Sequence, residues 1–257
     1  MKHREVIWFL SVFLGLLGLA AGLYFMARPP ERRGSLKPAL QEGVFVAMEG
    51  PTRITSSKDD RIAWTLSSLG LSFYRDRGQA DVHSPVALIP LRDGGTVEVS
   101  GALGFYSQAS EDISLHGLVR VRQTREGKLN WALAGSDAYY RHAAEVFDLD
   151  EISGTLYPEN GETVGIEGGE GKYYIKTRTM SLDRDVRCRF KDGITLMTDH
   201  LTYDVATETA STASAVAITG QGFDMKSLGL SANLKTRMVV APAMVNVRLS
   251  KGMKGKK

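Results

Sequence analysis

The residues of this chain that could do chemistry are few and widely spaced. Its histidines are His3, His83, His116, His142 and His200. No two of them are three or four residues apart, and none lies beside the single cysteine, Cys188. Because local zinc sites need closely spaced ligands, a metal site would have to be assembled from distant segments. We expect His116 and His200 on a solvent-facing side of the fold. One cysteine also excludes an intrachain disulfide.

Other segments could in principle bind an ion or a substrate, but each lacks a required partner. Gly165–Lys172 is glycine-rich like a phosphate-binding loop, yet no Ser or Thr follows the lysine and glutamates lie where phosphate would bind. Asp148, Asp150 and Glu151 do not have the spacing of a calcium loop. No G-x-S-x-G sequence is present, and no base is identifiable for Cys188. We therefore expect no catalytic residue, no cofactor and no metal.

An N-terminal apolar segment is the most distinctive part of the sequence. Val6–Ala27 has 22 residues without a charge, enough to cross a bilayer core of about 30 Å as a helix. This is longer than the core of a signal peptide, so we expect an uncleaved transmembrane anchor over residues 1–27. Four small residues of this segment lie on one helical face: Ser11, Gly15, Gly18 and Gly22. This face could pack against another helix. Alternatively, the pattern could reflect the abundance of glycine in membrane helices.

The charge of the chain is concentrated at its ends. Prolines and mixed charge indicate a linker over residues 28–41, and residues 251–257 form a lysine-rich tail. Residues 38–250 hold 22 Lys and Arg against 27 Asp and Glu, which argues against a nucleic-acid-binding protein. Basic residues flank both ends of the anchor, and a strict count places the body in the cytoplasm. The short N-terminal tail before a long body instead favours export, which we expect.

Strict alternation of apolar and polar residues runs through residues 42–250 and predicts strands with one buried face. It is clearest over residues 180–190, where Met180, Leu182, Val186, Cys188 and Phe190 share one parity. Arg184 has the same parity and is an exception. We find no segment with a helical period, so the sequence predicts an all-β domain.

The strands also recur with a period of about 33 residues. Turn-type pairs occur at Asp59-Asp60, Asp93-Gly94, Glu126-Gly127, Asn160-Gly161 and Asp192-Gly193, and more weakly at Leu228-Gly229. A tyrosine ends an apolar stretch between successive turns, at Tyr74, Tyr106, Tyr140, Tyr174 and Tyr203. We therefore expect about six units, each of two or three antiparallel strands, stacked into an elongated, twisted antiparallel sheet with a continuous apolar inside.

The inward parity of these strands is a candidate groove for acyl chains. The same side chains could instead interdigitate and fill a closed core, and the sequence does not separate the two. The residues concerned are Val97, Val99, Leu103, Phe105, Ile113, Leu115, Val119, Val121, Met180, Leu182, Val186, Phe190, Ile194, Leu196, Tyr203, Val216 and Ile218.

Five stretches carry a resemblance to a known family: DVHSPVALIPLRDGGTVEVSGALGFY (81–106), DISLHGLVRV (112–121), MSLDRDVRCRFKDGITLMTDHLTYD (180–204), AVAITGQGFDMKSLGL (215–230) and APAMVNVRL (241–249). In these the chain resembles LptC, the single-pass component of the lipopolysaccharide export machine, over the length from the anchor to about Leu249. It is longer than a usual member, with about two additional units between Gly117 and Lys191.

The resemblance implies an open, twisted β-jellyroll in the periplasm, held in the inner membrane by the anchor. It would receive lipopolysaccharide from an ABC transporter and pass it to an LptA-like periplasmic bridge protein. The transporter complex would bind the helix and the N-terminal edge near Val44–Ile54, and the bridge protein the C-terminal edge near Val239–Leu249. We therefore expect a non-enzymatic lipid carrier. The alternative is a membrane-anchored β-repeat scaffold with a filled core that recruits partners through its edges.

Overall fold

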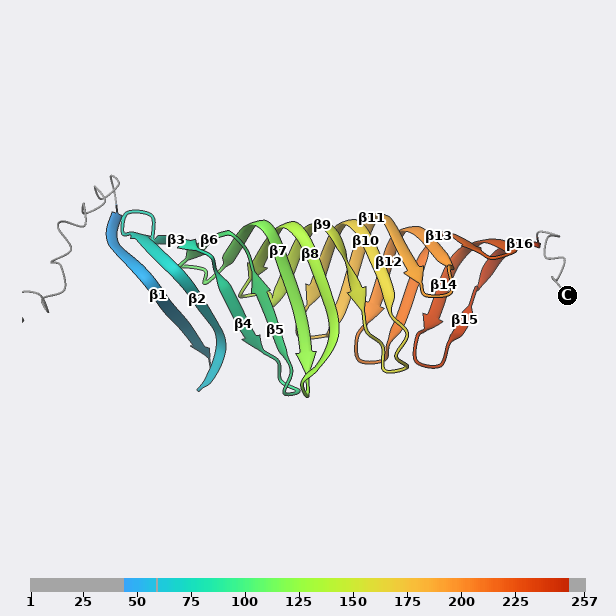
Figure 1. Ribbon diagram of the computed structural model, residues 1–257, viewed down its shortest axis with the longest axis horizontal. Helices are drawn as coiled ribbons and strands as arrows, with labels where there is room; N and C mark the ends of the chain where they lie inside the picture. Colours follow the sequence, from blue (N-terminus) through green and yellow to red (C-terminus); the bar gives the residue numbers. More distant parts are fainter. Residues whose placement is uncertain (1–43, 59, 250–257) are drawn as a thin grey trace, which may run out of the picture. The chain divides into compact units, whose positions relative to one another are not determined.

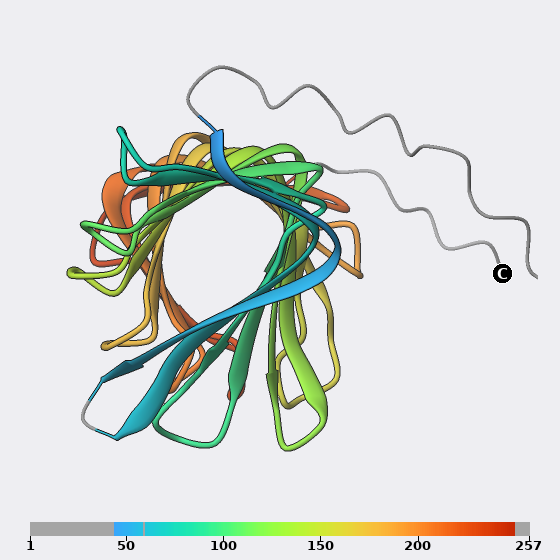
Figure 2. The same cartoon turned by 90° about the vertical axis from the view of Figure 1, so that its left-hand side faces the viewer.

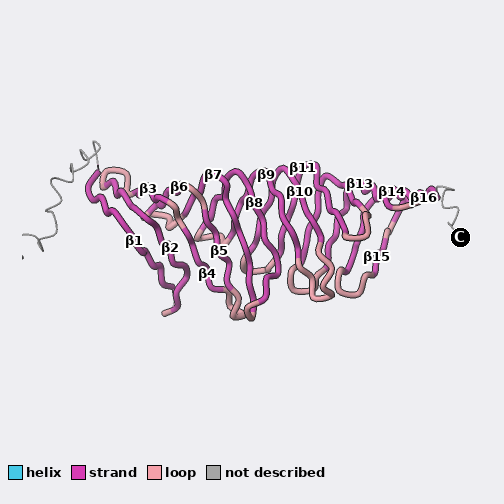
Figure 3. Tube along the Cα trace, viewed as in Figure 1, coloured by secondary structure: helices cyan, strands magenta, loops and turns pink. Residues whose placement is uncertain are grey.

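A computed structural model describes residues 44–58 and 60–249, which form one antiparallel sheet of 16 strands (Figures 1 and 3). These residues contain no helix that could span a membrane. The expected anchor, with Ser11, Gly15, Gly18 and Gly22, lies outside them, as do the linker and the basic tail. The strands are β1 (Val44–Lys58), β2 (Arg61–Tyr74), β3 (Gln79–His83), β4 (Val86–Pro90), β5 (Thr96–Ser100), β6 (Leu103–Ser107), β7 (Ile113–Arg125), β8 (Lys128–Arg141), β9 (Val146–Leu156), β10 (Val164–Tyr174), β11 (Thr179–Phe190), β12 (Thr195–Asp204), β13 (Thr209–Gly220), β14 (Phe223–Asn233), β15 (Met238–Val240) and β16 (Ala243–Leu249).

From β7 to β14 each strand pairs with its neighbours in sequence, so this part of the sheet is a continuous meander. The prediction of an elongated, all-β, antiparallel sheet is confirmed. We call each stretch of chain that crosses the sheet once an arm. Most arms are one strand, but near the N-terminal end β3 and β4 together form one interrupted arm, and β5 and β6 form another. β2 accordingly pairs with both β3 and β4, and β7 with both β5 and β6.

A line of irregularities, here called the crease, crosses the strands near their middles. Register shifts lie on it between His116 and Val119 and between Asp183 and Val186. Bulges of this kind bend a strand and increase its twist. At the crease Arg184 and the residue after it have positive φ. Arg184 therefore points to solvent even though it shares the parity of the buried residues of β11.

Because every arm bends at the crease, the sheet folds over on itself and its strands wrap around a common axis (Figure 2). One contiguous apolar core fills the inside, from Trp64 in β2 to Ala232 in β14. Aromatic rings pack edge to face within it, with centroids 4.9 Å apart for Trp131 and Tyr173 and 5.4 Å apart for Trp64 and Tyr106. Burial of this core drives the two halves of the sheet together.

The arms are joined by two rows of turns. The first row consists of residues 75–78, 108–112, 142–145, 175–178, 205–208 and 234–237, and the second of residue 60 and residues 91–95, 126–127, 157–163, 191–194 and 221–222. The turn pairs from Asp93-Gly94 to Asp192-Gly193 fall in the second row, so the 33-residue period corresponds to two arms. The prediction was wrong for the weaker pair, Leu228-Gly229, which is not a turn. It lies in the crease, where Gly229 has a φ of +77°, and the sixth turn is instead Gln221-Gly222.

Candidate functional site

The inner face of the folded sheet is mostly apolar along its described length. Most of the residues with predicted inward parity are buried in the core: Val97, Val99, Ile113, Leu115, Val119, Val121, Met180, Leu182, Val186, Leu196, Tyr203, Val216 and Ile218. Phe190 and Ile194 are half-buried and pack against it. The alternation in sequence therefore identified the buried side of β5, β7, β11, β12 and β13, whereas lipid binding by these residues stays a prediction.

The prediction was wrong for two residues of β6. Leu103 and Phe105 are 50% and 45% exposed. They share the parity of Val97 and Val99 in β5, but the register of the pairing with β7 changes by one residue between Ser100 and Leu103. A change of one residue turns each following side chain to the other face of the sheet. Leu103 and Phe105 therefore lie on the outside.

The inside is tightly filled. In the C-terminal half, a space bordered by Leu156, Met180 and Tyr203 has a volume of only about 20 Å³, which is room for roughly one water molecule. Between Ala87, Ile113 and Phe147 no space remains for a water molecule. The inner side chains interdigitate, as in a closed sandwich.

Buried polar atoms interrupt this apolar inside at a few positions. Trp64 Nε1, Trp131 Nε1, Gln123 Oε1 and the Tyr173 hydroxyl are buried without a hydrogen-bond partner among the described residues. Burial raises the pKa of Tyr173 well above its ordinary value. Unpaired buried groups carry a desolvation cost, so the core is less stable than an all-apolar one of the same shape.

The two rows of turns meet along a line that we call the seam. An ion pair crosses it from Asp93 to Arg178, with Oδ2 and Nη1 2.6 Å apart. Burial alone would raise the pKa of Asp93, but hydrogen bonds from Gly95 and Arg178 and the charges of Arg178 and Arg125 outweigh this effect. The pKa of this carboxyl is therefore lowered, and the pair is charged at neutral pH.

Further contacts close the seam on either side of this pair. Toward the N-terminal end, the Ser56 hydroxyl donates a hydrogen bond to Glu111. Toward the C-terminal end, three contacts join residues 157–163 to residues 234–237: Lys235 Nζ to Glu159 Oε2 at 2.7 Å, Arg237 Nη2 to Glu162 Oε1 at 2.6 Å, and Asn160 Nδ2 to the Leu234 carbonyl oxygen at 2.6 Å. The folded sheet is thus fastened by polar side chains in its turns and at the end of β1.

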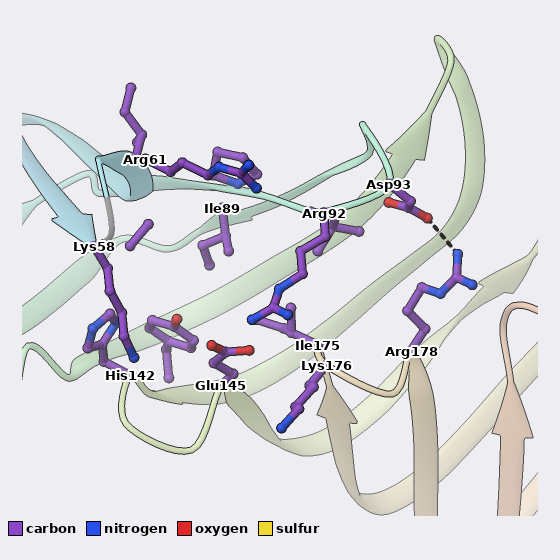
Figure 4. A pocket seen from close by; sticks show the side chains of 15 residues that line it. Lys58, Arg61, Ile89, Arg92, Asp93, His142, Glu145, Ile175, Lys176 and Arg178 are labelled. Carbon is purple, nitrogen blue, oxygen red and sulfur yellow. Dashed lines mark hydrogen bonds and ion pairs between the residues drawn. The ribbon is translucent and has the colours of Figure 1, made fainter.

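A hollow of about 1040 Å³, here called the seam hollow, lies between the Ser56–Glu111 contact and the Asp93–Arg178 pair (Figure 4). Its walls come from the ends of β1, β2, β4 and β8 and from three turns. Five Lys and Arg residues line it: Arg178, which pairs with Asp93, and Lys58, Arg61, Arg92 and Lys176. Sequence reasoning missed these residues, because they lie in or beside three turns that are distant in sequence and no spacing connects them.

At both ends of the sheet the last strands have an edge that pairs with no other described strand. β1 pairs only with β2, and β15 and β16 pair only with β14. Both edges expose apolar side chains, such as Phe45 and Met48 in β1 and Val245 and Val247 in β16. Exposed edges with apolar side chains are able to pair with another strand. These strands contain the two segments predicted to be edges, Val44–Ile54 and Val239–Leu249.

The side chains that could do chemistry are not arranged as an active site. On the outer face, His200 contacts Asp183 (Nδ1 to Oδ1, 2.6 Å) and Thr202 (Nε2 to Oγ1, 3.1 Å), an order that resembles a hydrolase triad. The three cavities at residues 58–178, 87–147 and 156–234 are not lined by these residues, and a nucleophile needs a bound substrate beside it. Burial raises the pKa of Cys188 to about 12, so its thiol is unreactive at neutral pH.

A comparison with models of protein families matches this chain to one family. The model of the family described as "Lipopolysaccharide-assembly, LptC-related" matches residues 14–126 and again residues 124–246. The chain belongs to the LptC family. Membership gives it a role in lipopolysaccharide transport, and the LptC family is a transport component rather than a known family of enzymes.

Other comparisons add little to this assignment. The comparison with curated proteins gave no match. Among solved structures, the chain is similar to LptH from Pseudomonas aeruginosa, described as the LptA homologous periplasmic component of the conserved lipopolysaccharide transport device. The identity is 8%, over 79% of this chain and 96% of that one, with a TM-score of 0.24. A score this low gives the likeness no weight for the fold or the function of this LptC family member.

Proposed function

We propose that this LptC family member is a non-enzymatic lipid carrier. It receives lipopolysaccharide from an inner-membrane ABC transporter on the inner face of its folded sheet and passes it to a periplasmic bridge protein for outer-membrane assembly. The observation that carries this proposal is the contiguous apolar core of the inner face, which extends from β2 to β14 in a sheet whose two ends have unpaired edges. An acyl chain on this face would be shielded from water all along the domain.

The energetics suit transfer better than storage. Burying an acyl chain yields roughly 0.8 kcal/mol per CH₂ group, so even a short chain is held strongly in a preformed groove. Here the inside is filled by its own side chains, and the seam has to open before a chain can enter. The cost of opening offsets part of the burial energy, so lipid is held weakly enough to be released.

The two edges lie at opposite ends of the sheet, so each can bind a different partner. We propose that β1 pairs with the transporter complex, together with an N-terminal transmembrane helix, and that the edge near Val239–Leu249 pairs with an LptA-like bridge protein. Strand addition at an exposed edge supplies main-chain hydrogen bonds and extends one sheet into the next. In this proposal the chain is a single-pass inner-membrane protein with its β domain in the periplasm.

The filled inside also favours a second candidate function. A cavity of about 20 Å³ in the C-terminal half is far too small for an acyl chain. The domain could therefore be an anchored scaffold that holds the transporter and the bridge together through its edges while lipid passes elsewhere. The two functions differ in whether lipid ever touches the buried side chains.

Site-specific photocrosslinking in cells distinguishes them. Phe190 is the best position for a benzoyl-phenylalanine probe, because it is half-buried at the inner face and matches the probe in shape. Val186, which is 1% exposed, is a second inner position, and Arg187 is the matched control on the outer face of the same strand. Lipopolysaccharide adducts at Phe190 and Val186 but not at Arg187 support the carrier. If the probe-bearing protein is folded and abundant and no inner position gives an adduct, the scaffold is correct.

A further inference from the structure

The seam hollow differs from the rest of the seam in its charge. Of its five Lys and Arg side chains only Arg178 has an ion-pair partner among the described residues; Lys58, Arg61, Arg92 and Lys176 have none. The hollow also contains the carboxylates of Asp93 and Glu145, and Asp93 is already engaged by Arg178.

Like charges gathered in one hollow repel each other, so their clustering costs free energy that something must offset. Residues 38–250 carry more acidic than basic groups, so a cluster with four unpaired cations is not a sample of the average surface. Such a cluster attracts anions and is most stable when an anion occupies it. Lys58 and Arg92 extend toward the middle of the hollow from opposite walls, with Glu145 between them (Figure 4).

The floor of the seam hollow is apolar and belongs to the core. Ile89 and Tyr140 are 3% and 4% exposed and are part of the contiguous core, and Ile175 packs against it. A molecule in the hollow thus meets cations at the rim and the inner face of the sheet beneath. This combination fits an amphiphile with an anionic head better than a free anion, which has no use for the apolar floor.

The hollow also lies at a gap in the fastening of the seam. The contacts nearest to it are the Ser56–Glu111 hydrogen bond and the Asp93–Arg178 ion pair, on its two sides. The volume of about 1040 Å³ is at the upper end of the range of ligand pockets, roughly 300–1,000 Å³. A head group bound here would hold its acyl chains directly above the line along which the sheet opens.

We propose that the seam hollow is a side opening that binds the phosphorylated head of a lipid through Lys58, Arg92 and Lys176, with the acyl chains directed onto Ile89 and Ile175. This rests on the proposed carrier function and specifies where lipid enters and which group is recognised. Lysine and arginine at the rim bind phosphate through charge-assisted hydrogen bonds.

The test uses the full-length protein in a non-ionic detergent, with the photoprobe at Phe190 to report lipid on the inner face. The ligands are phosphorylated lipid A and the same lipid after phosphatase treatment. The variant is Lys58→Gln, Arg92→Gln and Lys176→Gln combined. The matched control is Arg120→Gln, Arg187→Gln and Lys226→Gln, which removes the same number of cations from the exposed outer face of β7, β11 and β14. Urea unfolding establishes that both variants fold.

Removing three phosphate-binding cations should lower the adduct yield with phosphorylated lipid A by about tenfold at limiting lipid. The yield with dephosphorylated lipid should not change, and the control variant should behave as the wild type. Equal yields for wild type and variant with both lipids would overturn this proposal and leave the carrier function intact. A loss in the control variant as large as in the hollow variant would overturn it too, since overall charge would then be the cause.

Two further outcomes separate the sources of phosphate and the two proposals. Inorganic phosphate at the same phosphate concentration should not reduce the adduct. If it competes as well as phosphorylated lipid does, the hollow is a site for free anions and the lipid assignment is wrong. If the wild type gives no adduct at Phe190 with either lipid, the carrier function itself fails, and this side opening fails with it.

Discussion

Replacing Arg178 by glutamine removes the cation that holds the turn at residues 91–95 to the turn at residues 175–178. The guanidinium lies 2.6 Å from Asp93, and the two side chains are 32% and 22% exposed. Two unit charges about 4 Å apart attract each other by roughly 4 kcal/mol at an effective dielectric constant of about 20. Partial exposure and the ordering of two side chains reduce this to about 1 kcal/mol of net stabilisation.

This energy applies to local opening of the seam rather than to unfolding of the whole domain. A loss of about 1 kcal/mol increases the population of the open seam about fivefold, because about 1.4 kcal/mol corresponds to a factor of ten. Native-state amide hydrogen exchange measures such openings directly. The reporter amides are Leu91, which donates to the Gly95 carbonyl oxygen at 2.8 Å, and Gly94, which donates to Leu91 at 3.2 Å.

The matched control is Arg125→Gln. Arg125 lies 3.8 Å from the same Asp93 carboxylate but belongs to the same side of the seam, so its loss should raise exchange less than about twofold. Asp93→Asn added to Arg178→Gln should cause little further increase, because the pair is already broken. Equal exchange in Arg178→Gln and the wild type, or equal effects of the Arg178 and Arg125 changes, would refute the idea that this pair fastens the seam.

Three further outcomes are expected. Gly154→Ala should destabilise the full-length protein by about 2 kcal/mol or more in urea unfolding, because its Cβ would lie under 2.5 Å from the Ala132 carbonyl oxygen. Gly165→Ala in the adjacent strand meets only ordinary contacts beyond 3.6 Å and should be neutral or slightly stabilising; equal effects would show that this close approach is not real. Tyr173→Phe should not lower the unfolding free energy and should raise it by up to about 1 kcal/mol, because the lost hydroxyl has no partner among the described residues; a loss above about 1 kcal/mol would reveal a partner for it. The lowered pKa of Asp93 means that the stabilisation by its ion pair is complete above the ordinary carboxyl value and is lost as the pH falls through the folded one. Exchange at Leu91, corrected for the intrinsic rate, should therefore rise only below about pH 4 in the wild type, with a smaller step in Arg178→Gln, where Gly95 and Arg125 still lower the pKa of Asp93; a step near neutrality would contradict the assignment.

The strands and their buried faces could be predicted because both depend on local patterns. Alternation identifies the inner face wherever a strand keeps its register, as it does on either side of the crease in β7 and β11. The register change beside Leu103 depends on how β6 pairs with a bulged partner, which nothing near Leu103 records. Arg184 is the converse case, since its bulge turns an apparently inward charge to solvent.

The seam and its hollow could not be predicted, because they join turns that are distant in sequence. Asp93 and Arg178 are 85 residues apart, and Asn160 and Leu234 are 74 apart. Turns rich in Asp, Asn and Lys are expected in any β protein, so their composition carries no sign of which turns will meet. The partners follow only from the number of residues per arm and from the angle at the crease.

The seam has a mechanical consequence for the domain. A tube that is slit along its length resists torsion and spreading far less than a closed tube with the same wall, and links across the slit restore most of the stiffness. Here the wall is a hydrogen-bonded sheet, whereas several of the links are ion pairs on the surface, such as Lys235 with Glu159 and Arg237 with Glu162. Salt screens surface charges but leaves backbone hydrogen bonds intact. Higher ionic strength should therefore loosen the seam at these side chains and leave the sheet itself unchanged.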